Sequence, residues 1–216
     1  MLQRIDNEEN FRAGLKKAAE IIISGGIVAY PTESFYGLAV NATNEKAIQH
    51  LFFVKKRRRD NPVLILIPSI EVLDQYVTHV SETAGKLMDQ FWPGGLTMIF
   101  EAGPNISPLL TGNTDKIGVR LSNHPTATAL AQAVGVPITG TSANISGKPA
   151  CLNAGEVFDS LGKEIDFILD GGETKGGRGS TILDVTVIPP KVVREGIVSR
   201  EQLKEFSKCW SKSRNP

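Results

Sequence analysis

The sequence is poor in cysteine and aromatic residues and contains no long apolar run. Cys151 and Cys209 are its only cysteines in 216 residues, and they form neither a disulfide framework nor a CxxC motif for zinc or redox chemistry. We therefore expect free thiols in a reducing compartment. No apolar run approaches the roughly 18 residues that a membrane span requires, and charges throughout the first twenty positions leave no signal-peptide core. These absences predict a cytoplasmic protein with no membrane partner.

The usual motifs of metal, dinucleotide and covalent catalysis are also missing. The histidines form no HExxH pattern, and neither GxGxxG nor GxSxG occurs. The glycine-rich segment Gly171–Thr181 has Arg178-Gly179 where a phosphate loop has Lys-Ser/Thr, and it leads into a predicted strand. A mobile lid carrying Lys175 and Arg178 is the interpretation that this segment leaves open. The remaining candidates for chemistry are cationic side chains.

Charge is nearly balanced over the whole chain, with 24 Lys and Arg against 23 Asp and Glu, a formal net charge of +1. No overall field therefore attracts nucleic acid or anionic lipid, and any anion site must be local. The strongest local feature is a run of consecutive cations from Lys55 to Arg59. Two interpretations stay open: cations that stabilise the C-terminal end of a helix on a solvated face, or an anion-binding cluster.

Two further segments contain candidate anion ligands. Residues 139–147 (TGTSANISG) follow a predicted strand, and their amides and small polar side chains either bind phosphate oxygens or simply cap a loop. In the predicted strand 117–121, alternation separates the apolar side chains from Gly118 and Arg120, which share the other face. A buried Arg120 requires an anionic partner, either a carboxylate of this protein or a ligand phosphate. Arg194 poses the same question.

Hydrophobic periodicity and turn residues predict interleaved helices and strands. The first helix is predicted from a cap at Asp6 or Asn7 to a stop at Gly25-Gly26. Further helices are predicted over 44–54, 70–76, 83–92, 126–134, from about 153, and over 201–210. Strands are predicted over 27–30, 37–40, 63–67, 96–100, 117–121, 136–139, 167–169, 180–187 and 192–194. This order predicts an α/β fold with a mixed sheet. We expect one domain over 1–200, then a terminal helix and polar tail over 201–216, with no second domain.

Six segments together resemble the motif set of the YrdC/TsaC family of threonylcarbamoyl-AMP synthases. They are Tyr30–Leu38 (YPTESFYGL), Lys55-x-Arg57, Pro93–Thr97 (PGGLT), Val119-Arg120, Ser142–Gly147 (SANISG) and Ser180–Ile182 (STI). Their order and spacing agree with the family over roughly residues 25–199. The resemblance implies a YrdC-type, three-layer α/β domain, in which a twisted mixed sheet and its helices surround a deep, concave, positively lined cavity.

The resemblance also implies a reaction. L-Threonine, bicarbonate or CO2, and ATP would give L-threonylcarbamoyladenylate and pyrophosphate, for threonylcarbamoyladenosine modification of tRNA. Mg2+ would accompany ATP as cofactor, without a dedicated protein metal site. A downstream TsaD-type transferase complex would accept the labile product.

The resemblance implies three sets of site residues, in which Arg59 and Gly140 are included because they neighbour the motifs and the others because they match them. The catalytic pair is Lys55 and Arg57. The ATP ligands are Lys55, Arg57, Arg59, Ser142, Asn144 and Arg194. The threonine ligands are Thr32, Arg120, Gly140 and Ser180, the glycine through its carbonyl oxygen.

Two alternatives to the synthase stay open. A YciO-like paralogue would keep the same nucleotide framework with weak or different activity. An RNA-binding module would contact tRNA or double-stranded RNA through phosphates, and its affinity would fall steeply with salt.

Overall fold

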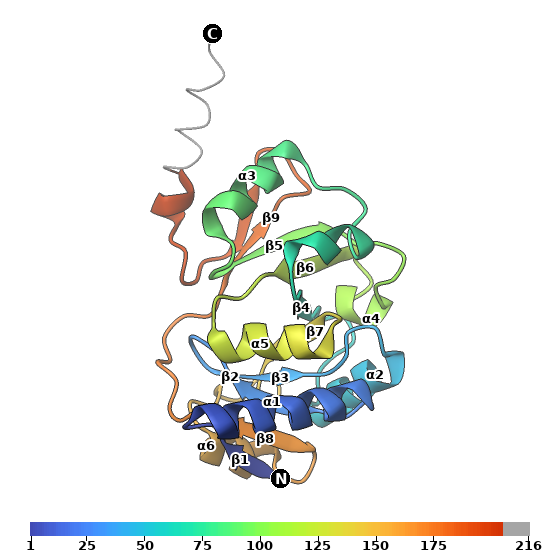
Figure 1. Ribbon diagram of the computed structural model, residues 1–216. Helices are drawn as coiled ribbons and strands as arrows, with labels where there is room; N and C mark the ends of the chain where they lie inside the picture. The colour runs from blue at the N-terminus through green and yellow to red at the C-terminus, as the bar shows by residue number, and fades with distance from the viewer. Residues whose placement is uncertain (205–216) are drawn as a thin grey trace.

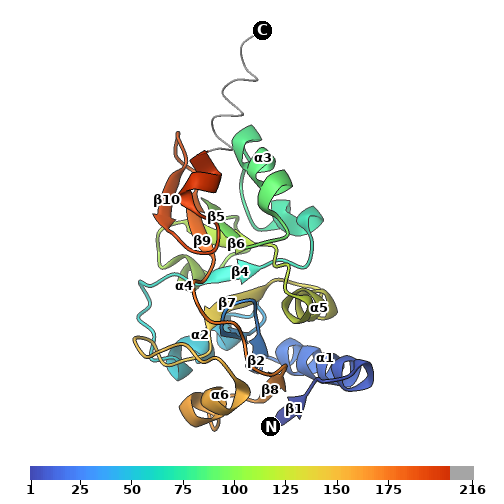
Figure 2. The same cartoon turned by 90° about the vertical axis from the view of Figure 1, so that its left-hand side faces the viewer.

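The computed structural model describes residues 1–204, and these build one mixed sheet with helices on both faces (Figures 1 and 2). The strands are β1 (Leu2–Arg4), β2 (Val28–Pro31), β3 (Tyr36–Ala39), β4 (Leu64–Leu66), β5 (Leu96–Glu101), β6 (Lys116–Arg120), β7 (Ile138–Ser142), β8 (Phe167–Asp170), β9 (Thr181–Asp184) and β10 (Lys191–Arg194). The helices are α1 (Glu8–Ile23), α2 (Glu45–Val54), the 3-10 helix η1 (Ile70–Gln75), α3 (Glu82–Phe91), α4 (Pro108–Thr111), α5 (Pro125–Val134) and α6 (Ala154–Leu161).

Several helices begin at a polar residue whose side chain binds a free amide of the first turn. Asn7 caps α1, because its side chain accepts a 2.8 Å hydrogen bond from the Asn10 amide. Asn44 and Asn153 cap α2 and α6 in the same way. Gly25, with a φ of +95°, lets the chain leave α1 in a left-handed conformation. These boundaries confirm the predictions for α1, α2 and α6.

The sheet has the strand order β1-β8-β2-β3-β7-β4-β6-β5-β9-β10. The pairs β4–β6 and β5–β9 are parallel, whereas β2–β3 and β9–β10 are antiparallel. The prediction of a mixed sheet is therefore confirmed. Strand β7 pairs antiparallel with both β3 and β4, so it joins the two halves of the sheet.

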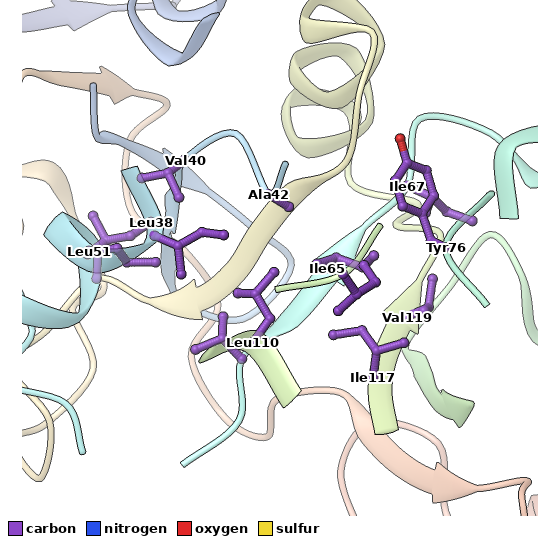
Figure 3. Packing of buried hydrophobic residues seen from close by; sticks show 14 of the residues in the cluster. Leu38, Val40, Ala42, Leu51, Ile65, Ile67, Tyr76, Leu110, Ile117 and Val119 are labelled. Atoms are coloured by element: carbon purple, nitrogen blue, oxygen red, sulfur yellow. The ribbon is translucent and has the colours of Figure 1, made fainter. Parts of the chain in front are cut away.

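The two faces of the sheet pack against different helices. On one face, Leu38, Ile65 and Val119 belong to a core that extends to Leu51 of α2 and Leu110 of α4, as Figure 3 shows. On the other face, a second core packs strands β2, β7 and β8 against α1 and α5. Figure 2 shows α1 and α5 on the opposite side of the lower strands from α2 and α6. The helices thus form the two outer layers.

Four details differ from the sequence predictions. Strand β7 continues to Ser142, because it pairs with β3 through Gly37 and Ser142, so residues 140–142 are strand and not loop. Strand β1 was not predicted, because its three residues carry no pattern and form a strand only by pairing with β8. Helix α4 was not predicted either, and the segment 70–75 is a 3-10 helix.

The C-terminal prediction is only partly inside the described residues. Residues 201–204 are helical, while the rest of the predicted helix over 201–210 and the tail to 216 lie outside the described residues. The domain boundaries therefore stay predictions. Within residues 1–204, no helix combines the length and apolar character needed to cross a membrane.

Candidate functional site

A cavity of about 660 Å3 lies against the sheet face that carries Gly118 and Arg120. Strands from both halves of the sheet line it, and so does the turn between β2 and β3. The predicted site residues that it brings together are Thr32, Arg57, Arg120, Gly140, Ser142, Ser180 and Arg194. The predicted residues outside its lining are Lys55, Arg59 and Asn144.

Arg120 occupies the buried end of β6 and faces this cavity. Its Nε donates to the Gly94 carbonyl at 2.8 Å, and its Nη2 donates to Glu33 Oε1 and to Ser122 Oγ, the latter at 3.3 Å. The alternation predicted for this strand is confirmed, since Ile117 and Val119 lie in the core on the opposite face. The sequence left open whether Arg120 pairs with a carboxylate of the protein or with a ligand phosphate. In the structure it pairs with a carboxylate of the protein, Glu33.

The turn that carries Glu33 is held by its neighbour Thr32. Thr32 Oγ1 donates to the Phe35 carbonyl at 2.6 Å and accepts from the amides of Ser34 and Phe35. Tyr36 anchors the same region, because its hydroxyl donates to the Gly172 carbonyl at 2.8 Å. Burial, followed by the charge of Asp170, raises the pKa of Tyr36 to about 12. The Thr32 side chain is therefore already part of the turn.

Ser180 belongs to a buried pair of hydroxyl groups at the start of β9. Thr97 Oγ1 on β5 donates to Ser180 Oγ at 2.8 Å, and both residues are buried. Arg194 Nη2 donates to the Ser180 carbonyl at 2.9 Å, which ties β10 to the same wall. The Thr97 bond leaves the Ser180 hydroxyl hydrogen available for an acceptor in the cavity.

Lys55 is buried in the protein, although it begins the basic run that was interpreted as a solvated face or an anion-binding cluster. It is 1% exposed, and its Nζ donates to the carbonyls of Ser142 and Asn144, the second at 2.7 Å. Its own carbonyl accepts from the Ser146 amide at 2.8 Å. Burial, followed by the charge of Arg57, lowers the pKa of Lys55 to about 7. Lys55 is therefore neither a solvated cation nor a lining residue of the cavity, and it braces the segment 142–146.

The polar segment after β7 uses most of its hydrogen-bonding groups internally. The amide of Ala143 donates to the Tyr36 carbonyl at 2.7 Å, and the Asn144 amide donates to the Ser142 carbonyl at 3.0 Å. Ser142 Oγ donates to Asn144 Oδ1, and Asn144 Nδ2 donates to the Lys148 carbonyl at 2.5 Å. Among the described residues these contacts favour the capped loop over an open nest of amides. Ser142 still lines the cavity.

The rest of the basic run divides between two cavities. Arg57 lines the main cavity and also a neighbouring one of about 590 Å3, and it is braced by the carbonyls of Asn61 and Pro62 at 3.0 and 2.7 Å. Burial lowers its pKa. Of these two cavities, Arg59 lines the neighbouring one and not the main one. Arg58 pairs with Asp60 on the surface. Beyond the buried Lys55, the arginines of this run thus lie in three environments: the main cavity, the neighbouring cavity and the surface.

Gly140 has a packing reason to be glycine. A Cβ at this position would lie 2.3 Å from Leu64 Cδ1 on the adjacent strand. A side chain at this position would therefore require the Leu64 side chain, which also lines the cavity, to shift.

The charged residues of the cavity are mainly cationic. Among the described residues that line it, Arg57, Lys116, Arg120 and Arg194 face a single carboxylate, Glu33. Lys116 is itself paired with Asp184 at 3.2 Å. This balance favours anionic ligands, because a partly desolvated cluster of cations attracts negative charge more strongly than exposed cations do.

Sequence reasoning missed three residues at this site: Glu33, Thr97 and Lys116. Glu33 and Thr97 lie inside the quoted motifs YPTESFYGL and PGGLT, so those motifs contained the only available signal. Lys116 lies at the start of β6 and belongs to no motif. Its place in the cavity follows from alternation along that strand, since it shares a face with Gly118 and Arg120.

The glycine-rich segment 171–180 connects β8 to β9 and runs between the two halves of the molecule in Figure 2. It is attached to the protein at several points. Both Thr174 N and Thr174 Oγ1 donate to the Leu152 carbonyl at 2.8 Å, and Gly176 N donates to the Ser34 carbonyl at 2.7 Å. Lys175 lines a third cavity, beside Thr32 and Glu33. The lid motion stays a prediction.

Within residues 1–204, no three His, Cys, Asp or Glu side chains are grouped so that they could hold a metal ion.

The fold and the cavity define a class of protein: a mixed α/β domain whose sheet carries a cationic site. A family model named for Sua5, YciO and YrdC, and described as "Telomere recombination", matches residues 20–196. The chain belongs to this Sua5/YciO/YrdC family. Both the family and the fold implied by the sequence motifs are thereby confirmed.

Individual relatives agree with this placement. Threonylcarbamoyl-AMP synthase of Pyrococcus abyssi is 38% identical over 191 residues, which cover 88% of this chain and 56% of that protein. The structure of P. abyssi Sua5 complexed with L-threonine matches with a TM-score of 0.89 and 37% identity, over 95% of this chain and 60% of that one. The structure of E. coli YciO matches with a TM-score of 0.81 and 28% identity, over 94% and 97%. The chain spans slightly more than half the length of the P. abyssi enzyme.

Proposed function

We propose that this chain is an L-threonylcarbamoyladenylate synthase, a nucleotidyltransferase that uses L-threonine, bicarbonate or CO2, and ATP. The observation that carries the proposal is the cavity, in which four cations and the hydroxyls of Thr32, Ser142 and Ser180 surround about 660 Å3. Membership of the family and the names of the relatives support the same activity.

The cavity suggests a division between the two substrates. Arg57 and Ser142 would hold the nucleotide phosphates, and Arg194 would add a further cation. Thr32, Arg120 and Ser180 would hold L-threonine, with the Gly140 carbonyl near its amino group. Lys55 would act on the nucleotide site through the carbonyls of Ser142 and Asn144, to which it donates. Asn144 would act through its hydrogen bond with Ser142.

The chemistry requires positioning and positive charge. The threonine amine combines with bicarbonate to form a carbamate, with loss of water. A carbamate oxygen then attacks the α-phosphorus of ATP, the bond from that phosphorus to the bridging oxygen breaks, and pyrophosphate leaves. Cations beside the phosphates stabilise the charge that develops on pyrophosphate, and fixed ligands on both substrates bring the reacting atoms together. Mg2+ would enter with ATP and neutralise part of that charge.

Several wider roles belong to the same proposal. The product would serve threonylcarbamoyladenosine modification of tRNA in the cytoplasm, through a TsaD-type transferase complex. The predicted contacts with tRNA or double-stranded RNA would be tested by a salt series of RNA binding.

The test is mass spectrometry of reaction mixtures that contain the protein, ATP, Mg2+, bicarbonate and L-threonine. We expect threonylcarbamoyl-AMP and pyrophosphate, and we expect both to disappear when any one substrate is omitted. Ser180→Val should impair the use of threonine more than the binding of ATP, because it removes the hydroxyl that Thr97 orients. Product that forms without threonine would contradict the proposal.

A YciO-like activity is the second candidate, because E. coli YciO matches this chain over nearly its whole length. In that case ATP would bind, but no threonine-dependent adenylate would form, and other amino acids would be screened in the same assay.

A further inference from the structure

The ion pair between Glu33 and Arg120 joins two distant parts of the sheet. Glu33 lies in the turn between β2 and β3, whereas Arg120 ends β6, three strands further along the sheet order from β3. The two side chains are only 20% and 8% exposed. Glu33 also lines the third cavity of about 370 Å3, so the pair stands at the boundary of both cavities.

The contacts of Arg120 fix the guanidinium in one orientation. Three segments supply the acceptors: the Gly94 carbonyl accepts from Nε, and Glu33 Oε1 and Ser122 Oγ accept from Nη2. Among the described residues, Nη1 makes no hydrogen bond. Because a guanidinium is planar, fixing Nε and Nη2 also fixes the direction of the two Nη1 hydrogens. Arg120 therefore presents one edge that protein acceptors leave available for a ligand.

The charge of the pair selects the kind of anion that fits this edge. Glu33 offsets the charge of Arg120, so the pair attracts a triphosphate less strongly than an isolated arginine would. An amino acid carries one carboxylate and an amino group, and it suits a site where a cation and an anion lie side by side. Arg57 and Arg194 form no ion pair among the described residues and suit phosphate better.

Glu33 also has an unused oxygen. Its Oε2 is buried and has no hydrogen-bond partner among the described residues. A buried acceptor without a partner costs stability, which a purely structural ion pair would avoid.

We propose that Glu33 is a positioning residue for the amino-acid substrate: it holds the Arg120 guanidinium so that Nη1 receives the substrate carboxylate. This inference rests on the proposed function for the identity of the amino acid. Glu33 acts through Arg120. Because it already restrains the Arg120 side chain, Arg120 loses less conformational entropy when the carboxylate binds.

The test is isothermal titration of L-threonine and, separately, of ATP into the full chain and its Glu33 variants. Glu33→Ala should raise the Kd for threonine roughly tenfold, as expected for a weakened charge-assisted hydrogen bond, and change the Kd for ATP less than about twofold. Glu33→Gln keeps the side-chain shape and one acceptor oxygen, and it should have an intermediate effect. It is also the variant of choice if Glu33→Ala does not fold.

Asp184→Asn is the matched control, because it removes the carboxylate partner of another lining cation, Lys116. We expect it to leave the Kd for threonine unchanged. If Glu33→Ala and Glu33→Gln bound threonine with the affinity of the unaltered chain, this inference would be overturned, but the proposed function would not. Tighter threonine binding would also overturn the inference, since Glu33 would then compete with the substrate for Arg120. If the unaltered chain bound ATP but no threonine, the proposed function would fall, and this inference with it.

Discussion

Lys55 and Arg120 are both buried cations, and their surroundings compensate their charge in different ways. Arg120 lies against the carboxylate of Glu33, so the charge that it brings into the protein is matched by an opposite one. Among the described residues, the Nζ atom of Lys55 donates only to the carbonyl oxygens of Ser142 and Asn144, and burial lowers the pKa of Lys55 to about 7. Carbonyl dipoles alone therefore compensate a buried ammonium less completely than a carboxylate would. Each of the two cations supports a different wall of the site.

Arg120→Met should give the largest loss of stability. The substitution leaves the Glu33 carboxylate partly buried without its cation, and we expect the free energy of unfolding to fall by about 3 kcal/mol in urea titrations. The control is Arg58→Met, which breaks an arginine–aspartate pair whose side chains are 83% and 59% exposed. That variant should change stability by about 0.5 kcal/mol or less. Equal losses in the two variants would show that burial of the pair is irrelevant.

Lys55→Met should have the next largest effect. It keeps an unbranched side chain in the core but leaves the carbonyls of Ser142 and Asn144 without their donor, at a cost of about 2 kcal/mol. Lys56→Met, at the exposed neighbouring position, should lie within about 0.5 kcal/mol of the unaltered chain. Thermal or urea unfolding of both variants tests this difference. An undiminished stability of Lys55→Met would show that the two hydrogen bonds of Lys55 contribute nothing to stability.

Arg57→Met should weaken the binding of ATP roughly tenfold, because Arg57 lines the main cavity and a charge-assisted hydrogen bond is worth about 1.5–3 kcal/mol. Arg59→Met should change it about threefold or less, since Arg59 lines only the neighbouring cavity. Titration calorimetry with ATP measures both. A comparable loss in the two variants would support the predicted role of Arg59 as a direct phosphate ligand.

Lys55 should also make the stability of the protein depend on pH. Its pKa is lowered from 10.5 to about 7 in the folded protein, so between these values the unfolded chain binds more protons than the folded one. The contribution of Lys55 to stability must then rise with pH across this window. We expect the difference in unfolding free energy between the unaltered chain and Lys55→Met to increase from pH 7 towards pH 10. A difference that stays constant or decreases would contradict the lowered pKa.

The sequence predicted much of the fold, because local signals carried most of it. Asparagine caps and apolar periodicity defined α1 and α2, and alternation in β6 placed Arg120 on the face that forms the cavity. Strand β1 could not be predicted, since Leu2–Arg4 becomes a strand only through pairing with β8, more than 160 residues away. The C-terminal part of β7 was assigned to a loop for the same reason: its partner strand β3 is distant in sequence.

The candidate site was predicted as a set of residues but not as a set of contacts. Of the ten predicted site residues, seven line the main cavity, while Lys55 and Asn144 brace its edge and Arg59 lines another cavity. Glu33 was missed, because nothing in the turn sequence shows that its carboxylate meets Arg120, 87 positions later.

By itself, the sequence determined the family, the order of helices and strands, and the side chains available for chemistry, because these depend on residue type and short spacing. Only the tertiary structure decided what each cation does. Lys55 and Arg57 belong to one basic run, but the Lys55 side chain is buried whereas the Arg57 side chain lines the cavity. This difference depends on which distant segments pack against each side chain. The carboxylate beside Arg120 and the carbonyls around Lys55 come from such segments, and their electrostatic effect arises only after the chain has folded.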